Sequence, residues 1–477
     1  MPEYSPLLSA LAFLVPLGYA LIAAAGLPEE RARHAALSML AALGLAVVGY
    51  IATGFAIEYG GVGLVHNLPG TEGLIWEWSA IGETWGASWG MAGLAGWGLA
   101  EPADTTGAYT LALASLPWVM TAALIPLIAL RGAAPAWGSA LAGLLVGAVL
   151  YPLAGNWIWG GGWLAGLGQN LGLGHGFVDF GGAGLVHLLG AATACAGIVV
   201  FLRRKPGAAR TDEPVPLPPV HLPLLGVTGG MLLLVGLPAW LTGNPLVDPG
   251  TVDTPRTILN VVLIIATGAL LPLLYTWFVS GHADPLMAVR GVAASSVVAL
   301  ATAPFVSVMS SMALGALIGL LTPLAIYFSD RIFRLDDRAA VLIVHGLAGL
   351  TGLLAVGILA DGTAGQGWND VTAGGVTGLL ATDAAQAGVP GQLQAQAVGA
   401  AVLALLGFFG AWLCFAPLAL LARFLTPVAP EPSAAGVSAA SRADQDEFLA
   451  ADGEIGPVVD ADDSFVQAPA SESPFSG

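Results

Sequence analysis

Two histidines in matching positions of two charge-free apolar segments are the residues of this chain best placed to do chemistry. They are His187, in DFGGAGLVHLLGAATACAGIVVF, and His345, in AVLIVHGLAGLTGLLAVGIL. Each histidine follows a valine and precedes a threonine by six residues. Because an ionisable group inside a membrane helix is costly, it usually faces a pathway rather than lipid. Two related copies indicate two halves of one chain that face each other across a common axis.

The composition is that of a polytopic membrane protein. Of the 477 residues, 56% are hydrophobic and 9% are charged, and the mean hydropathy is +0.80. A soluble protein of this length would carry roughly 25% charged residues. Glycine, with 66 residues, favours close helix packing in lipid. We therefore expect an all-α polytopic membrane protein with the lipid bilayer as its surroundings.

Charge-free stretches predict eleven transmembrane helices. The stretch 291–329 is too long for one span, and with a start at Pro285 it holds two helices broken near Thr302-Ala303-Pro304. Each of the others can hold a helix of about 20 residues. These others are 4–28, 35–57, 105–130, 132–178, 180–202, 214–247, 257–283, 339–360 and 384–422.

The basic residues predict the orientation. With an outer N-terminus, eleven spans place nearly all of the basic residues on the cytoplasmic side and leave Arg256 outside. We expect a multi-pass protein of the plasma (inner) membrane with a cytoplasmic C-terminus. The basic residues placed inside are Arg31, Arg33, Arg131, Arg203, Arg204, Lys205, Arg210, Arg331, Arg334, Arg338, Arg423 and Arg442.

The linker 203–221 is the natural boundary between two repeats. Five spans precede it in residues 5–202, five follow in 222–360, and a last helix is expected at 395–425. An odd number of spans per half implies that the second repeat is inverted in the membrane. Residues 1–426 would thus form one membrane domain built as an inverted 5+5 repeat plus a final helix.

Two loops and the tail complete the organisation. The outer segment 58–104 contains five tryptophans and five glutamates, starting with Glu58, and 361–394 is a second long loop. Such a loop is either a functional cap or a variable insertion. Residues 427–477 carry ten acids and one arginine, which predicts an acidic, disordered cytoplasmic tail.

Several function classes are excluded. The chain has no basic patch that would suggest a nucleic-acid partner. Cys195 and Cys414 both lie in apolar spans, so neither a disulfide nor a metal site is implied. No nucleophile–base pair lies within one motif, and we expect neither an enzyme nor a cofactor.

Four segments resemble the signature regions of the Amt/MEP/Rh ammonium transporter family. The clearest is YPLAGNWIWGGGWLAGLG followed by DFGGAGLVH, which is similar to that family's WGGGWLA and DFAGG patterns. The resemblance covers roughly residues 30–425 in the same order. The other segments are DPLMAVRGVAASSVVALATA (284–303), LDDRAAVLIVHGLAGLTG (335–352) and the looser ALSMLAALGLAVVGYIATGFAIEYG (36–60).

The resemblance implies an ammonium-transporter fold and a mechanism. Family members are homotrimers in which each protomer has its own pore; ammonium is recruited at an outer vestibule, loses its proton and passes two facing histidines. By motif, His187 and His345 would be that pair, Asp179 the acid before the fifth span, and Trp159 the vestibule tryptophan. Removing a cation from water is costly in a low-dielectric pore, and aromatic faces attract a cation by roughly 0.5–2 kcal/mol.

The recruitment site departs from the family pattern. Trp118 and Trp240 stand where gate phenylalanines are expected, and Asn244 would replace a serine hydroxyl. An aspartate expected five residues before the second histidine is Ala340. Arg290, five residues into a span, either reaches the cytoplasmic headgroups or acts in gating.

Alternatives stay open at this point. Asp179 is either an N-cap or a direct cation contact, and Trp159 either an interfacial anchor or a vestibule residue. The chain is an ammonium channel or transporter, an ammonium sensor on the same scaffold, or a pore for another small neutral gas or amine. In related transporters a small cytosolic nitrogen-signalling protein blocks the inner mouth, and the altered inner loop and tail leave this partner open.

Overall fold

The structure is a computed structural model that describes residues 6–27, 29–82, 85–86, 89–130, 134–202, 222–248, 250–333, 337, 339–381 and 390–425. The predicted linker 203–221 and acidic tail 427–477 lie outside these residues. Residues up to Leu420 form one unit, and the account below concerns that unit.

Among the described residues, eleven helical segments are long and apolar enough to cross a membrane, as the sequence predicts. The chain is therefore a multi-pass membrane protein. The spans are Pro6–Ala24, Ala32–Leu64, Thr106–Leu130, Ala136–Ile158, Ala183–Phe201, Pro223–Thr242, Thr254–Ser280, Pro285–Thr302, Val308–Ile332, Leu342–Leu359 and Gln392–Ala422.

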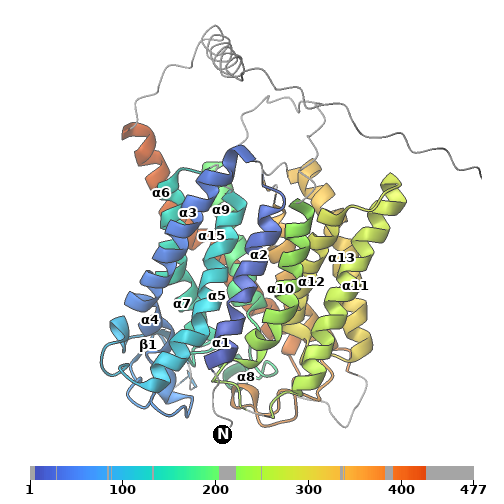
Figure 1. The fold of residues 1–477 in the computed structure, drawn as a ribbon. Coiled ribbons are helices and arrows are strands. Elements are labelled where there is room, and N and C mark those ends of the chain that lie inside the picture. Colours follow the sequence, from blue (N-terminus) through green and yellow to red (C-terminus); the bar gives the residue numbers. More distant parts are fainter. Residues whose placement is uncertain are drawn as a thin grey trace, which may run out of the picture. The chain divides into compact units, whose positions relative to one another are not determined.

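Several spans combine more than one helical element, and Figure 1 shows their arrangement. The α-helices are α1 (Pro6–Ala12), α2 (Leu14–Ala24), α3 (Glu29–Gly49), α4 (Phe55–Tyr59), α5 (Thr106–Leu130), α6 (Ala136–Leu145), α7 (Tyr151–Ile158), α8 (Leu167–Leu171), α9 (Leu189–Phe201), α10 (Leu222–Thr242), α11 (Thr254–Ser280), α12 (Pro285–Thr302), α13 (Val308–Phe328), α14 (Ala348–Leu359) and α15 (Gln392–Leu425). Short π-helical turns are η1 (Tyr50–Gly54), η5 (Val146–Leu150), η6 (Ala183–Leu188), η7 (Ser329–Phe333) and η8 (Leu342–Leu347). The 3-10 turns are η2 (Val62–Leu64), η4 (Trp97–Leu99) and η9 (Trp368–Asp370).

Helices of the two halves pack against each other where glycine removes the side chain. Helix α2 lies against α10, and the two are neighbours in Figure 1. A Cβ atom on Gly18 would stand 2.8 Å from the carbonyl oxygen of Gly229, and one on Gly229 would stand 2.5 Å from that of Gly18. This backbone-to-backbone approach is what small residues make possible between membrane helices.

The second span is longer than the sequence indicates, and the predicted start of the outer segment at residue 58 is wrong. The helical segment continues to Leu64, so Glu58 lies inside it and is only 1% exposed. The carboxylate can be buried here because the hydroxyl of Tyr50 donates a hydrogen bond to it at 2.7 Å. A charge-free criterion cannot detect a span that contains a paired carboxylate.

The rest of the first long loop includes a small hairpin. Strand β1 (Glu77–Ser79) pairs antiparallel with β2 (Gly90–Gly93), and β2 contacts α4 and α7. The indole of Trp157 donates to the carbonyl of Met91 at 2.9 Å. This part of the loop is therefore packed onto the ends of two spans.

The break predicted near Thr302-Ala303-Pro304 is present: α12 ends at Thr302 and α13 begins at Val308. Asn260 of α11 supports the break, because its side-chain amide donates to the carbonyls of Ala303 (2.8 Å) and Val306 (2.9 Å). These carbonyls have no partner in a helix at this point, so the amide replaces the missing backbone bonds.

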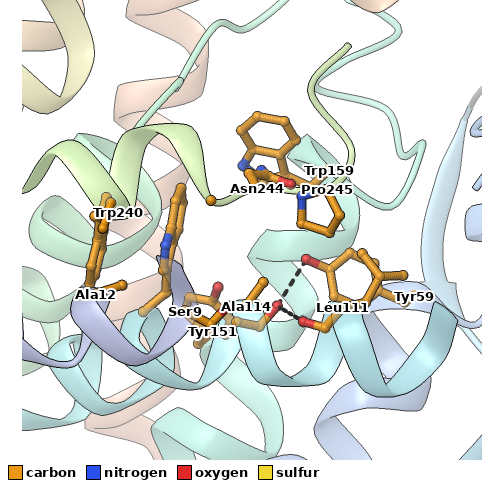
Figure 2. Close-up of a pocket in the computed structure, with 14 residues that line it drawn as sticks. Ser9, Ala12, Tyr59, Leu111, Ala114, Tyr151, Trp159, Trp240, Asn244 and Pro245 are labelled. Carbon is orange, nitrogen blue, oxygen red and sulfur yellow. Dashed lines mark hydrogen bonds between the residues drawn. The ribbon is translucent and has the colours of Figure 1, made fainter. Parts of the chain in front are cut away.

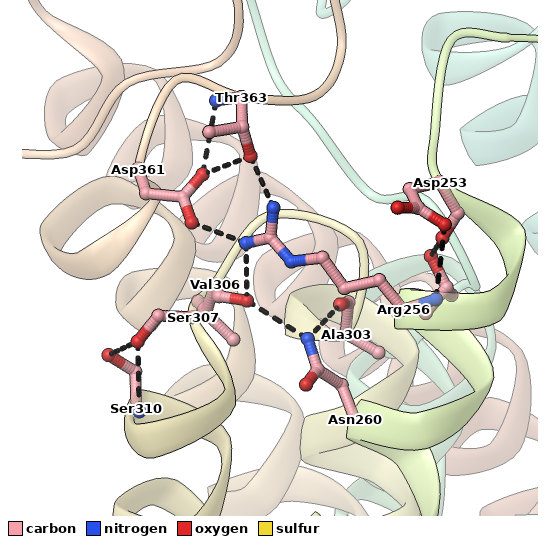
Figure 3. A network of polar contacts seen from close by, with 10 residues as sticks. Asp253, Arg256, Asn260, Ala303, Val306, Ser307, Ser310, Asp361 and Thr363 are labelled. Atoms are coloured by element: carbon pink, nitrogen blue, oxygen red, sulfur yellow. Dashed lines mark hydrogen bonds and ion pairs between the residues drawn. The ribbon is translucent and has the colours of Figure 1, made fainter.

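Arg256 ties the same region to the loop after α14 (Figure 3). Its guanidinium forms an ion pair with Asp361 and donates to Thr363 at 2.5 Å and to the carbonyl of Val306 at 2.7 Å. The arginine that the basic-residue pattern left on the outer side thus joins three segments at one end of the spans. We call this the loop end; among the described residues it carries 65–82, 89–105 and 360–381.

Candidate functional site

The two matching histidines meet inside the protein. The Nδ1 atoms of His187 and His345 lie 2.9 Å apart, and the ring planes are nearly parallel, with an angle of 11° between them and centroids 5.0 Å apart. The two rings therefore meet edge to edge through their Nδ1 atoms. Their exposed fractions are 0% and 3%. A hydrogen bond between two Nδ1 atoms requires one ring to donate and the other to accept. The pair therefore cannot carry two imidazolium charges.

Both histidines lie in π-helical turns, η6 and η8, which begin at the ends of their spans. A π-turn widens the helix by one residue per turn and is frequent at functional sites. Its presence in the same position of both halves is consistent with the predicted repeat.

Tyr19 of α2 holds the pair from one side. Its ring makes edge contacts with His187 at 5.2 Å and with His345 at 5.1 Å between centroids. Its hydroxyl lies 2.8 Å from the hydroxyl of Ser296 on α12. The tyrosine is thus anchored by a polar contact while its ring packs against both imidazoles.

Aspartates cap both π-turns. The carboxylate of Asp179 accepts from the backbone N–H groups of Gly184 (3.0 Å) and Leu185 (2.7 Å). Burial raises the pKa of Asp179 to about 6, although these bonds oppose the shift.

Asp337 plays the same part in the second half, where it accepts from Val341 (2.9 Å) and Leu342 (2.8 Å). Each aspartate precedes its histidine by eight residues. The spacing D-x7-H is therefore present in both halves, and the sequence analysis did not single it out.

Two tryptophans stack face to face at the loop-end side of the histidines. The rings of Trp118 on α5 and Trp240 on α10 have centroids 5.0 Å apart and an interplanar angle of 4°. The indole N–H of Trp240 donates to the carbonyl of Gly181 at 2.9 Å. Gly182 makes room for the other ring, because a Cβ there would stand 2.8 Å from Trp118 Cζ3.

Four of the residues expected in the outer vestibule line one small cavity (Figure 2). The cavity has a volume of about 20 Å³, and its walls include Trp118, Trp159, Trp240 and Asn244. This is the size of a single water or ammonium. None of the described residues that line it is acidic, and Asp179 is not among them.

The polar wall of this cavity comes from residues that the sequence analysis missed. Tyr59, Ser115 and Tyr151 line it, and the hydroxyls of Tyr59 and Ser115 lie 3.1 Å apart. Asn244 takes part through a turn, in which its side-chain oxygen accepts from the backbone N–H of Leu246 at 3.0 Å. The hydroxyl expected near Asn244 is thus supplied by other spans.

A second small cavity lies beyond the histidines. Its volume is about 40 Å³, and Tyr19, Arg290 and His345 are among its lining residues. Along α5, Trp118 lines the first cavity and Ile128 the second, a separation of about 15 Å. The order is therefore first cavity, tryptophan pair, histidine pair, second cavity. Arg290 faces the far cavity.

A larger chamber adjoins the first cavity on its loop-end side. Its volume is about 430 Å³, it shares Trp159 with the cavity below, and Asp248 and Asp370 line it. His66 also lines it, and burial lowers the pKa of this histidine although both aspartates act against the shift. A neutral histidine and two carboxylates make the fixed charge of the chamber negative, which concentrates cations.

Metal chemistry finds no support in the described part of the chain. No group of three or more His, Cys, Asp or Glu side chains there could hold a metal ion. Cys195 and Cys414 are both free thiols.

These features define a class: a multi-pass helical membrane protein in which small cavities flank a stacked tryptophan pair and a hydrogen-bonded imidazole pair, both drawn from the two halves of the chain. A model of the Ammonium Transporter Family matches residues 6–430. The chain therefore belongs to the Ammonium Transporter Family, whose members are transporters rather than enzymes.

Individual relatives are more distant. The chain is 32% identical over 283 residues to ammonium transporter Amt2 of Archaeoglobus fulgidus, which covers 59% of this chain and 60% of the relative. It is 33% identical over 224 residues to a putative ammonium transporter of Synechocystis, and this match covers 44% of this chain and 47% of the relative. The matched segments span less than two thirds of these relatives' own length.

Solved structures show the same fold. Candida albicans Mep2 superimposes with a TM-score of 0.67 at 20% identity, covering 95% of this chain and 91% of that one. A protein described as a sensor Amt protein gives a TM-score of 0.66 at 21% identity, and the match covers 88% of this chain and 92% of that one.

Proposed function

We propose that this protein conducts ammonium or ammonia across a membrane through a pore lined by His187 and His345. The observation that carries the proposal is the order of features between the halves: a cavity of about 20 Å³ walled by tryptophans, then the Trp118–Trp240 pair, then the histidine pair. The first cavity fits one small cation, and the Trp118–Trp240 pair stands between it and the histidine pair.

The chemistry of each layer supports this order. The indole faces of Trp118, Trp159 and Trp240 stabilise a cation by roughly 0.5–2 kcal/mol each, and hydroxyl oxygens can accept its N–H groups. Passing the stacked pair would strip the remaining water, which is costly for a charge by several kcal/mol. Neutral ammonia crosses more easily, and His187 Nε2, which has no hydrogen-bond partner among the described residues, could bond to it or relay the proton.

The proposal also includes the location of the protein and its assembly. We place the protein in the plasma membrane with its N-terminus outside and the first cavity toward the outer side, which the basic-residue pattern favours. A homotrimer with one pore per protomer is the assembly that the family resemblance implies. The cytosolic nitrogen-signalling regulator stays a prediction of that resemblance alone.

The decisive experiment measures ammonium-dependent current and internal pH in proteoliposomes containing wild type, His187→Ala or His345→Ala. A current that rises with ammonium and changes in both variants is expected. His175→Ala is the matched control, because His175 is a fully buried histidine that does not line the described cavities of the passage. If both pore variants conduct like wild type, the pore assignment is wrong. Alkalinisation without current would assign the pore to a neutral gas or amine.

A second candidate function is ammonium sensing with little or no transport. The face-to-face contact of Trp118 and Trp240 favours it, because rings 5.0 Å apart leave no open path in this conformation. The acidic tail, with ten carboxylates and one arginine, would then carry the output. Truncation after Thr426 should abolish a cellular ammonium response and leave transport unchanged, and a response that survives truncation argues against sensing.

A further inference from the structure

Glu58 is a carboxylate buried inside a membrane span, and the pore described above does not use it. It lies on α4 within the second span and is 1% exposed. An ionisable side chain at such a place is expensive and usually has a function together with a specific partner.

Tyrosine hydroxyls surround this carboxylate. Tyr50 donates to Glu58 Oε2 at 2.7 Å, and the hydroxyls of Tyr59 and Tyr151 lie close to the same group. Glu58 Oε1 has no hydrogen-bond partner among the described residues. Gly155 makes room for the carboxyl group itself, since a Cβ there would stand 2.4 Å from Oε1.

The carboxylate stands directly behind the wall of the first cavity. Tyr59 and Tyr151 are lining residues of that cavity, and Tyr50 and Glu58 are not. Two tyrosine hydroxyls therefore separate the buried carboxyl group from the space in which a cation would be recruited. Hydroxyls in such a position can turn their oxygen lone pairs toward a cation while their hydrogens point to the carboxylate.

We propose that Glu58 supplies the counter-charge for ammonium in the first cavity and acts through the hydroxyls of Tyr59 and Tyr151. It is a positioning residue, which sets the affinity of recruitment without touching the cation. In a low-dielectric surrounding the attraction between two charges is screened far less than in water, so a carboxylate separated from the cavity by one side chain can act on a cation there.

This inference rests on the proposed transport function and adds the group that balances the charge of the cation. A purely structural role has a different consequence. If Glu58 only joins a hydrogen-bonded tyrosine cluster, glutamine keeps an oxygen that can accept from Tyr50, and recruitment should not change.

The test compares the ammonium concentration that gives half-maximal current in wild type, Glu58→Gln and Glu58→Asp. We expect Glu58→Gln to raise this concentration about tenfold or more, the size of effect expected when a hydrogen-bonded charge is lost, with a smaller change in maximal current. Glu58→Asp keeps the charge and should recover most of the affinity.

Glu77→Gln is the matched control. Glu77 is a half-buried glutamate that accepts from the side chain of Asn156 at 3.1 Å, and it does not line the first cavity. Its replacement should leave the half-saturating concentration as in wild type.

The outcomes separate the two levels of the argument. Wild type without any ammonium response would refute the proposed transport. If wild type responds and the half-saturating ammonium concentration of Glu58→Gln lies within twofold of the wild-type value, the role of Glu58 is overturned. If Glu58→Gln does not assemble, Tyr151→Phe in the same assay decides: a several-fold loss of affinity supports the proposal, and unchanged affinity overturns it.

Discussion

Replacing Gly182 by alanine should displace the tryptophan pair and is the sharpest test of the site's packing. Gly182 has a φ of +78°, and an added Cβ would stand 2.8 Å from Trp118 Cζ3 and 2.9 Å from Val186 Cγ2. The left-handed backbone costs a non-glycine residue about 1–2 kcal/mol. Inserting a methyl group into a filled core costs typically another 1–3 kcal/mol.

Gly172→Ala separates these two effects. Gly172 has a φ of +66°, and no heavy atom lies within 4 Å of the position that an added Cβ would take. It should therefore show the backbone cost alone, about 1–2 kcal/mol. The difference between the two variants measures the clash with Trp118.

The assay is equilibrium unfolding in mixed detergent micelles, combined with ammonium flux in proteoliposomes. Gly182→Ala should be clearly less stable than Gly172→Ala and should alter flux, because Trp118 has to leave its stack on Trp240. Trp118→Phe in the Gly182→Ala background should recover part of the stability. Equal stability of the two glycine variants, with wild-type flux in both, would refute the reasoning.

Three further perturbations test other parts of the structure. Tyr19→Phe loses only the contact with Ser296 and should lower the free energy of unfolding by about 1 kcal/mol while the histidine pair keeps its place; a large loss of flux would contradict this. Arg256→Met leaves Asp361 without its ion pair and should lower the free energy of unfolding by about 2–3 kcal/mol, which unfolding in detergent would measure. Burial raises the pKa of Asp179 to about 6, so the folded state keeps a proton that the unfolded chain, with a pKa of about 3.9, has already released. The free energy of unfolding should therefore fall as pH rises from about 4 to 6. If the free energy of unfolding of Asp179→Asn falls as steeply with pH as that of wild type, Asp179 is not the cause.

Much of the fold could be predicted from the chain alone. Membrane spans are set by length and by the absence of charge, and both are local properties. The break between α12 and α13 could be placed because the charge-free stretch from Pro285 is twice as long as one span of about 20 residues. It must therefore hold two helices with a break between them. The second span is the exception, since a tyrosine 8 residues away in the helix shields the carboxylate of Glu58.

The candidate site could be predicted in part. The matching contexts of His187 and His345 in two related segments indicated that they face each other, and the structure brings their rings together. Asp337 was not singled out from the sequence, although the spacing D-x7-H occurs in both halves. Tyr19, Tyr59 and Tyr151 carry no such signal, because a tyrosine in an apolar span looks like any other packing residue.

The sequence by itself determined the class of the protein, the number of its spans and the residues at its centre. These follow from hydropathy, from charge and from motifs that act over a few residues. The tertiary structure alone decided which side chains share a cavity, how Trp118 lies on Trp240 and which carboxylate stands behind the wall. Such contacts join residues that are far apart in the chain, and they depend on how helices cross, which the local pattern of a chain does not encode.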